Sequence, residues 1–267
     1  MKKLIVSIII ATLGVYLYGS IVEIDGFKIK EYTIKDKDIP KSFEELKIVH
    51  FSDILYTKNE EKLNELVENI NKLNADIIIF SGDLLNNNMD YSDKDYEILQ
   101  NSLKKMNASL FKYAVIGDND LKRIDDYKDI LYESGFKLLD NEATLLFYKD
   151  MTPINIIGLT DLNNIEELLA SDTPYNYSLV ITHRPDSLTE LSGYDIDTVL
   201  SGHSLGGIIN VPYYGGIIKK DGAKTYINDY YKLNNTDIYI SNGLGYEKRN
   251  FRLFNTPSIN VYRFKNN

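Results

Sequence analysis

The chain has 267 residues, 43% of them hydrophobic and 26% charged, which is enough for one large or two small domains with a full hydrophobic core. A net charge of −9 and the lack of a long basic run argue against nucleic-acid binding. There is no cysteine, so disulfides, thiolate nucleophiles and cysteine-bound zinc are excluded, and imidazole chemistry has only His50, His183 and His203.

The chain starts with an apolar segment. Lys2 and Lys3 precede an uncharged run over residues 4–22, close to the roughly 20 residues that span a bilayer. A cleaved signal peptide is the alternative, but the end of the run does not supply the pair of small residues that a cleavage site needs. We expect residues 1–23 to form a membrane anchor or signal-like segment, and residues 24–267 to form the folded domain. The two lysines favour a cytoplasmic N-terminus, which predicts a single-pass protein of the cell membrane with its domain on the extracytoplasmic side.

Beyond this segment, strand-like apolar runs alternate with amphipathic helical runs. Residues 23–35 alternate apolar and polar side chains, as in an edge strand or hairpin. Further strands are predicted over residues 46–53, 76–83, 110–120, 143–149, 154–160, 178–183, 197–203, 237–243 and 258–264. Helices are predicted over residues 58–73, 93–106 and 124–135. The alternation of strand and helix in the first half predicts a parallel sheet with crossover helices.

Polar side chains that bind metals follow several of these strands directly. They are Asp53, Asp83, Asp118, His183 and His203. In open α/β sheets, ligands bind at the carboxyl ends of the strands, and Asp and His are ligands of Zn, Mn and Fe. Each residue alone has a structural reading, since aspartate is a common turn former and a histidine can be a packed structural residue. As a set at matching places they predict a divalent metal site.

The motifs at these strand ends resemble those of the calcineurin-like metallophosphoesterase family. That family has, in order, Asp-x-His, Gly-Asp, Gly-Asn-His-Asp/Glu, a lone His and Gly-His-x-His. The corresponding stretches here are 53-DIL-55, 82-GD-83, 117-GDND-120, 182-THRP-185 and 202-GHSL-205. Residues 240–259 also resemble the last strands of the membrane-associated bacterial subgroup. The resemblance implies an α/β fold of the α/β/β/α sandwich type with mixed sheets, two divalent metals and phosphoester hydrolysis.

Departures from the family pattern fall unevenly on the two implied metal sites. Leu55 and Leu205 stand where the family has metal-binding histidines. The first implied site therefore keeps only carboxylates, those of Asp53 and of the bridging Asp83. Two carboxylates and two leucines do not make a transition-metal site.

The second implied site keeps ligand-capable side chains throughout. They are Asp83, Asp118, His183 and His203. Asp118 replaces a neutral Asn, which either strengthens the hold on a divalent cation or reflects drift in an inactive site. We expect one divalent ion, Mn, Fe or Zn, rather than two, with Asp53 as a weak ligand.

Other residues near these motifs bear on activity. Asn119 replaces the family's catalytic histidine, so it can donate a hydrogen bond but cannot titrate. Arg184 is either a contact for an anionic substrate or an exposed surface arginine. His50 is expected to be a packed strand residue rather than a replacement ligand, and Asp120 a turn or helix-start residue.

Different functions are compatible with this sequence. We expect a divergent metal-dependent phosphoesterase with a single remaining metal site, acting on a phosphoester-bearing small molecule or lipid. The alternative is a catalytically inactive relative that binds a metal or a phosphate ligand at the membrane surface. A purely structural or interaction domain is the third reading, which the retained ligand set disfavours.

Overall fold

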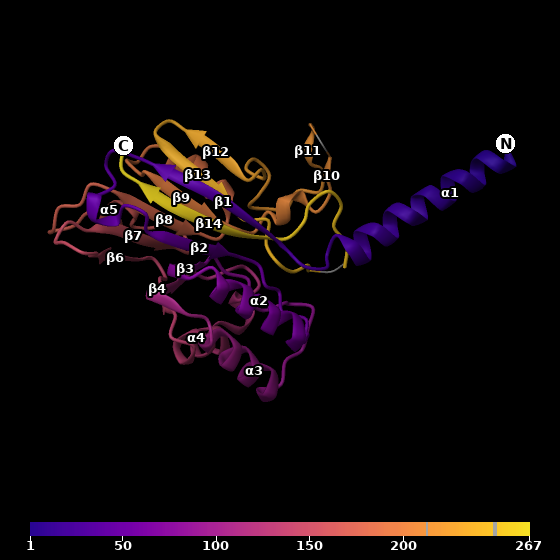
Figure 1. The fold of residues 1–267 in the computed structure, drawn as a ribbon, viewed down its shortest axis with the longest axis horizontal. Coiled ribbons are helices and arrows are strands. Elements are labelled where there is room, and N and C mark those ends of the chain that lie inside the picture. Colours follow the sequence, from indigo (N-terminus) through magenta and orange to yellow (C-terminus); the bar gives the residue numbers. More distant parts are fainter. Residues whose placement is uncertain (212, 248–249) are drawn as a thin grey trace.

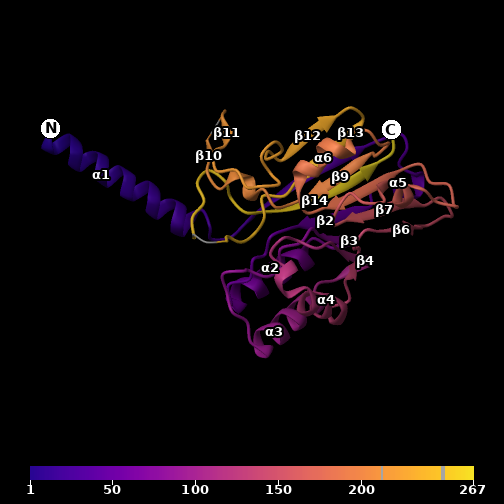
Figure 2. The same cartoon turned by 180° about the vertical axis from the view of Figure 1, so that it is seen from behind.

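The fold is built around two sheets that face each other (Figure 1). The structure is a computed structural model and describes residues 1–211, 213–247 and 250–267. Helices cover the outer face of each sheet, so the layers run α/β/β/α (Figures 1 and 2). The predicted fold class, a sandwich with mixed sheets, is confirmed.

The first sheet has six strands in the order β1–β14–β2–β3–β4–β5. Their bounds are β1 (Lys28–Lys35), β14 (Ser258–Lys265), β2 (Lys47–Phe51), β3 (Ala75–Phe80), β4 (Ala108–Ala114) and β5 (Lys137–Leu138). Neighbours from β2 to β5 are parallel, as the pattern of alternating strands and helices predicts. The last strand, β14, enters between β1 and β2 and runs antiparallel to β2, which makes the sheet mixed.

The second sheet has the order β12–β13–β9–β8–β7–β6. Its strands are β12 (Tyr230–Leu233), β13 (Thr236–Ile240), β9 (Thr198–Ser201), β8 (Ser178–Thr182), β7 (Ile154–Leu159) and β6 (Glu142–Leu146). The four central strands are parallel, and the edge strands β12 and β6 are antiparallel to their neighbours. A small hairpin pairs β10 (Asn210–Val211) with β11 (Gly215–Gly216).

Helices close the outer faces of the sandwich. The first sheet carries α2 (Glu60–Lys72), α3 (Asp93–Lys104) and α4 (Ile124–Glu133), and the second carries α5 (Ile165–Leu169) and α6 (Leu188–Leu191). Short 3-10 turns lie at Lys41–Phe43, Leu121–Arg123, Pro185–Ser187 and Leu205–Gly207. All the strands and helices expected from the sequence are present, with ends shifted by a few residues. The short elements β5, β10, β11, β12, α5 and α6 were not predicted.

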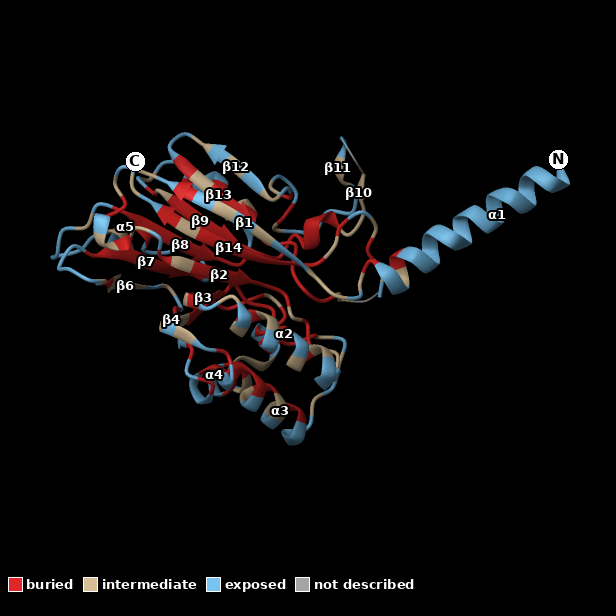
Figure 3. Ribbon diagram, viewed as in Figure 1, coloured by how far each residue is buried: buried red, intermediate tan, exposed pale blue. Residues whose placement is uncertain are grey.

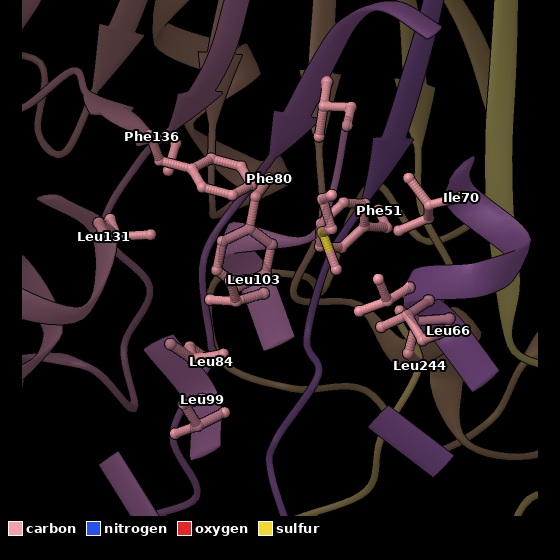
Figure 4. Close-up of a cluster of buried hydrophobic side chains, with 14 of the residues drawn as sticks. Phe51, Leu66, Ile70, Phe80, Leu84, Leu99, Leu103, Leu131, Phe136 and Leu244 are labelled. Carbon is pink, nitrogen blue, oxygen red and sulfur yellow. The ribbon is translucent and has the colours of Figure 1, made fainter. Parts of the chain in front are cut away.

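Continuous apolar runs form the central strands because both of their faces are buried. In β3, Ile77 and Ile79 face the other sheet, whereas Ile78 and Phe80 face the helices. Figure 4 shows this helix-side cluster, in which Phe51 and Phe80 stack at 5.1 Å between ring centroids. The packed cluster fixes the direction of β2 and β3, and therefore the place where their carboxyl ends meet.

The N-terminal helix α1 (Lys2–Leu17) extends away from the sandwich, and its side chains are exposed (Figure 3). It continues as a π-helical turn over Tyr18–Val22. Together, Lys2–Val22 are long and apolar enough to cross a membrane, with a mean hydropathy of 2.2, a test that a signal sequence also passes. The end of the helix contacts the domain, where Arg252 N donates to Gly19 O at 3.0 Å and Tyr16 stacks on Phe251.

Candidate metal centre

Four buried side chains meet where strands of both sheets end. Asp53 follows β2, Asp83 follows β3, His183 follows β8 and His203 follows β9. One ligand atom from each can be chosen so that all lie within 4.8 Å of one another. His183 Nε2 is 3.3 Å from Asp83 Oδ2 and 3.0 Å from His203 Nδ1. The two sheets therefore contribute two ligands each to one small volume.

The backbone at these strand ends is strained. Asp53, Asp83 and His203 have φ values of 52°, 63° and 65°, in the left-handed region that side chains rarely adopt. Leu55 and Leu205 share this conformation, with φ values of 45° and 46°. Such conformations cost of order 1 kcal/mol each and persist where the surroundings impose them. The two leucines thus adopt the same left-handed backbone as the candidate ligands although they offer no ligand atom.

Glycines allow these turns to pack against one another. A Cβ on Gly117 would lie 2.1 Å from Asp83 N, and one on Gly202 would lie 1.8 Å from Ser52 Oγ. Neither distance is possible between non-bonded atoms. Replacement of either glycine would therefore separate the loops that carry the ligands.

Asp120 anchors the loop that carries Asp83. Its two carboxylate oxygens accept hydrogen bonds from the backbone N–H groups of Asp83, Leu84, Leu85 and Gly117, at 2.8–3.1 Å. Burial and the charge of Asp83 raise the pKa of Asp120 to about 8, and these N–H donors act in the opposite direction. Asp120 is thus the organiser of a buried loop and not only the turn residue expected from the sequence.

The outer nitrogens of both histidines are already bound to carbonyl groups. His183 Nδ1 lies 2.7 Å from Ser81 O, and His203 Nε2 lies 2.7 Å from Asp221 O. If these nitrogens carry the protons, His183 Nε2 and His203 Nδ1 both present lone pairs to the centre. Two lone pairs facing each other at 3.0 Å require a proton or a cation between them.

Charges in the centre couple the protonation of its members. Burial lowers the pKa of His183, but the charge and hydrogen bond of Asp83 together with the charges of Asp53 and Asp118 outweigh burial, and the net shift is upward. Burial and the neighbouring charge of His183 lower the pKa of His203. Asp53 Oδ1 is buried and has no hydrogen-bond partner among the described residues. This set of acceptors fits a divalent cation, and Asp53, Asp83, His183 and His203 are the residues that could hold it.

Asp118 lies at the edge of this group rather than in its middle. Its Oδ2 is 3.5 Å from His203 Nδ1, and its Oδ1 accepts from Arg184 Nε at 2.7 Å. The side chain of Arg184 is half-exposed, and that of Asp118 is 28% exposed. The ligand role of Asp118 and the substrate role of Arg184 stay predictions, and in this structure the two side chains bind each other.

Asn119 binds the carboxylate of Asp83 through two hydrogen bonds. Its backbone N donates to Oδ1 and its Nδ2 donates to Oδ2, both at 2.7 Å. A histidine at position 119 would not offer the same amide donor. Asn119 therefore orients Asp83, a role that the motif comparison did not anticipate, and its catalytic role stays a prediction.

Leu205 fills space beside Asp53. A Cβ on Gly243 would lie 2.7 Å from Leu205 Cδ2 and 2.8 Å from Asp53 Cβ, so the two side chains share one wall. Leu55 is also fully buried. The centre is thus apolar on the side of the two leucines and rich in imidazole on the other.

Two further charged residues were missed by the sequence analysis. The side chain of Lys220 is only 12% exposed, and its buried Nζ is 2.7 Å from Glu247 Oε1. Burial lowers the pKa of Lys220, but the charges of Asp53, Asp83 and Glu247 outweigh burial and raise it above its usual value. Both residues lie in irregular loops without a motif, so no local signal pointed to them.

His50 lies outside the centre. It is buried in β2, with Nε2 2.8 Å from Ser81 Oγ and Nδ1 3.3 Å from the Tyr262 hydroxyl. It is thus a packed, hydrogen-bonded strand residue, as the sequence predicts.

Comparisons with known proteins agree on one family. The family model described as calcineurin-like phosphoesterase matches residues 46–207. The uncharacterized metallophosphoesterase YkuE of Bacillus subtilis is 31% identical over 260 residues, covering 94% of this chain and 90% of YkuE. The UDP-2,3-diacylglucosamine pyrophosphatase LpxG of Chlamydia muridarum is 25% identical, covering 85% and 87%. A Danio rerio transmembrane protein with metallophosphoesterase domain is 24% identical and covers 92% of this chain and 58% of that protein.

Proposed function

The chain belongs to the calcineurin-like phosphoesterase family, and we propose that it is a membrane-anchored phosphoester hydrolase with one divalent ion. The observation that carries the proposal is the meeting of Asp83, His183 and His203 at one buried point, with both histidines turned inward by their carbonyl partners. Asp53 belongs to the same buried group and is proposed as the fourth ligand, and Asp118 is proposed as a weaker one from the rim. Mn, Fe and Zn all suit this set of carboxylate and imidazole ligands.

Each residue has a defined part in the proposed reaction. The ion, when bound, supplies Lewis acidity and lowers the pKa of a water molecule. Asn119 holds Asp83 in place through its backbone N and its Nδ2. Arg184 releases Asp118 and binds a substrate phosphate instead, since a guanidinium binds phosphate well. The lack of a titrating group at position 119 removes acid–base help worth roughly 10²–10⁴-fold, so slow turnover is expected.

An apolar cavity supports a substrate with a lipid portion. A cavity of about 850 Å³ is lined by Leu205 and Glu247, which border the metal centre, and by Tyr16 and Ser20 of the proposed anchor. Its remaining lining includes Ile208, Ile209, Ile218 and Phe251. The relative LpxG is named for a diacylated substrate. We expect the full chain in lipid nanodiscs to hydrolyse a lipid phosphoester faster than a water-soluble one, and equal rates would contradict this substrate class.

The proposal is tested by measuring metal content and hydrolysis together. Purified full-length protein is reconstituted with Mn²⁺, analysed for bound metal and assayed with a model phosphodiester. The native chain should hold close to one ion, and His203→Ala should lose most of the metal and the activity. The matched control is His50→Gln, because His50 is a buried histidine outside the centre, and it should retain both. No metal in the native chain would contradict the proposal.

A catalytically inactive metal-binding relative is the second candidate. Asn119, Leu55 and Leu205 favour it, because three histidines of the family pattern are missing. Metal in the native chain without hydrolysis would support this candidate. Hydrolysis that appears only in the triple variant Leu55→His, Leu205→His and Asn119→His would identify these losses as the cause.

A further inference from the structure

We propose that Lys220 is a built-in cation that takes the electrostatic place of a second metal ion in the centre. The inference rests on the proposed single-ion site. It concerns the negative charge that a single ion leaves on the carboxylates of the centre. Lys220 comes from the loop after the β10–β11 hairpin, far in sequence from every metal-binding motif.

Buried carboxylates require compensation in this part of the centre. Asp53 and Asp83 are fully buried, and Asp53 Oδ1 has no hydrogen-bond partner among the described residues. A buried charge without a partner is strongly unfavourable. Leu55 and Leu205 prevent a second transition metal from adding its charge here, since they offer no ligand atom. A buried ammonium group with a fixed positive charge can do so.

Contacts connect Lys220 to the metal-binding carboxylate. Lys220 Nζ is 2.7 Å from Glu247 Oε1, and the same oxygen accepts a long hydrogen bond of 3.4 Å from Asn119 Nδ2. Asn119 Nδ2 in turn donates to Asp83 Oδ2 at 2.7 Å. The pKa of Lys220 stays high although burial lowers it, because Asp53, Asp83 and Glu247 attract its proton. The lysine therefore remains charged inside the centre.

The test compares metal stoichiometry in variants with and without the lysine. In the double variant Leu55→His and Leu205→His, Lys220 should limit binding to one Mn²⁺ per chain. Adding Lys220→Met should allow a second Mn²⁺ to bind, measured by elemental analysis after equilibrium dialysis. Adding Lys219→Met instead should leave one ion, because Lys219 is exposed. Two ions in the double variant with Lys220 intact would overturn the proposal.

A second measurement does not depend on the histidine variants. In the otherwise native chain, Lys220→Met should lower the melting temperature, and added Mn²⁺ should restore more of it than in Lys219→Met. Identical melting temperatures and Mn²⁺ responses for the two variants would also overturn the role of Lys220. A native chain that binds no Mn²⁺ would contradict the single-ion site, while the metal-free melting temperatures would still decide whether the lysine balances the acids.

A separate observation concerns the hairpin formed by β10 and β11. Tyr213 and Tyr214 at its tip have relative exposures of 106% and 90%, and Ile217 and Ile218 are exposed beside them. Figures 1 and 2 show that the hairpin projects from the domain on the side from which α1 extends. Tyrosine is enriched at membrane–water interfaces because its ring is amphipathic.

We infer that this hairpin contacts the lipid bilayer as a second attachment point beside α1. The inference depends on the proposed anchoring by α1, which brings the bilayer to this side of the domain. Exposed isoleucines and tyrosines next to a membrane anchor bury apolar area in lipid. The hairpin would hold the domain at a fixed angle to the membrane.

The chain has no tryptophan, so the fluorescence of one introduced tryptophan tests whether that position contacts lipid. Single variants Tyr214→Trp, Leu13→Trp and Tyr132→Trp are placed in nanodiscs that contain lipids brominated on the acyl chains. Bromine quenches only tryptophans that reach the lipid. Tyr214→Trp should be quenched, as should Leu13→Trp within α1, whereas Tyr132→Trp on α4 should not.

Each pattern of quenching has one meaning. Quenching at position 13 without quenching at position 214 would overturn the hairpin contact and leave the anchor intact. No quenching at either position would contradict membrane insertion of α1, and with it the hairpin contact. Equal quenching at all three positions would show nonspecific exposure to lipid and also overturn the inference.

Discussion

Asp120 ties together two loops of the candidate metal centre. Four backbone N–H groups converge on its two oxygens, and three of them belong to the loop of Asp83. The sequence shows this residue only as the end of the motif 117-GDND-120. Its importance follows from burial, since backbone donors away from water need an acceptor.

Asp120→Asn should destabilise the protein without changing its size. The amide offers one oxygen, and its NH₂ group would face backbone N–H donors, so buried donors would lose their partners. We expect the free energy of unfolding to fall by about 2–4 kcal/mol. Urea unfolding followed by circular dichroism measures this.

Asp129→Asn is the matched control for this change. Asp129 is exposed on α4, so the same substitution there should cost less than about 0.5 kcal/mol. Similar losses in the two variants would show that Asp120 does not anchor the loop.

At the scale of elements, the strands place the site residues just beyond their ends and bury the side chains along their length. β2 carries His50 in its middle and delivers Asp53 just beyond its end. The strand thus contains a histidine that burial keeps neutral, and an acid that faces the centre follows the strand. Burial lowers the pKa of His50 from 6.5 to about 3.

His50 should make the stability of the protein depend on pH. Below about pH 6.5 the unfolded chain binds a proton at this residue, whereas the folded chain does not until about pH 3. The free energy of unfolding therefore falls as the pH drops through this window, by up to about 1.4 kcal/mol per pH unit. His50→Gln should remove this contribution. The excess of the native chain's free energy of unfolding over that of the variant should therefore decrease from about pH 7 to about pH 5. The same difference in free energy of unfolding at both pH values would show that His50 is charged in the folded protein.

At the scale of the whole molecule, the proposed anchor and the border of the centre line one cavity. The last turn of the anchor contacts Phe251 and Arg252, and the large cavity is lined by residues of both the anchor and the centre. This arrangement fits a substrate that reaches the centre from the membrane. It also makes the side of the membrane on which the domain lies a central question for function.

An extracytoplasmic domain should be reachable from outside the cell. Because the native chain has no cysteine, Tyr132→Cys introduces a single thiol at a side chain that is 80% exposed. We expect a membrane-impermeant maleimide to label this variant in intact bacterial cells. A permeant maleimide confirms that the thiol is reactive. Labelling by the impermeant reagent only after lysis would place the domain in the cytoplasm.

Local patterns explain why much of the fold was predictable. An apolar run such as Ile77–Phe80 followed by Gly82 and Asp83 carries its strand, its turn and its polar end within a few residues. The same holds for α2, whose apolar spacing and Asn59 cap are local. The place of β14 between β1 and β2 was not predictable in this way, because it depends on pairing between the two ends of the domain.

The sequence by itself determined the family, the strand-end positions of Asp53, Asp83, His183 and His203, and the loss of two imidazoles at Leu55 and Leu205. These features are encoded by residues adjacent along the chain. Only the tertiary structure decided that Asp118 binds Arg184, that Asn119 and Asp120 hold Asp83 and its loop, and that Lys220 reaches the centre. Those contacts join loops that are distant in sequence, and no local pattern encodes a contact whose partners are brought together only by the packing of the two sheets.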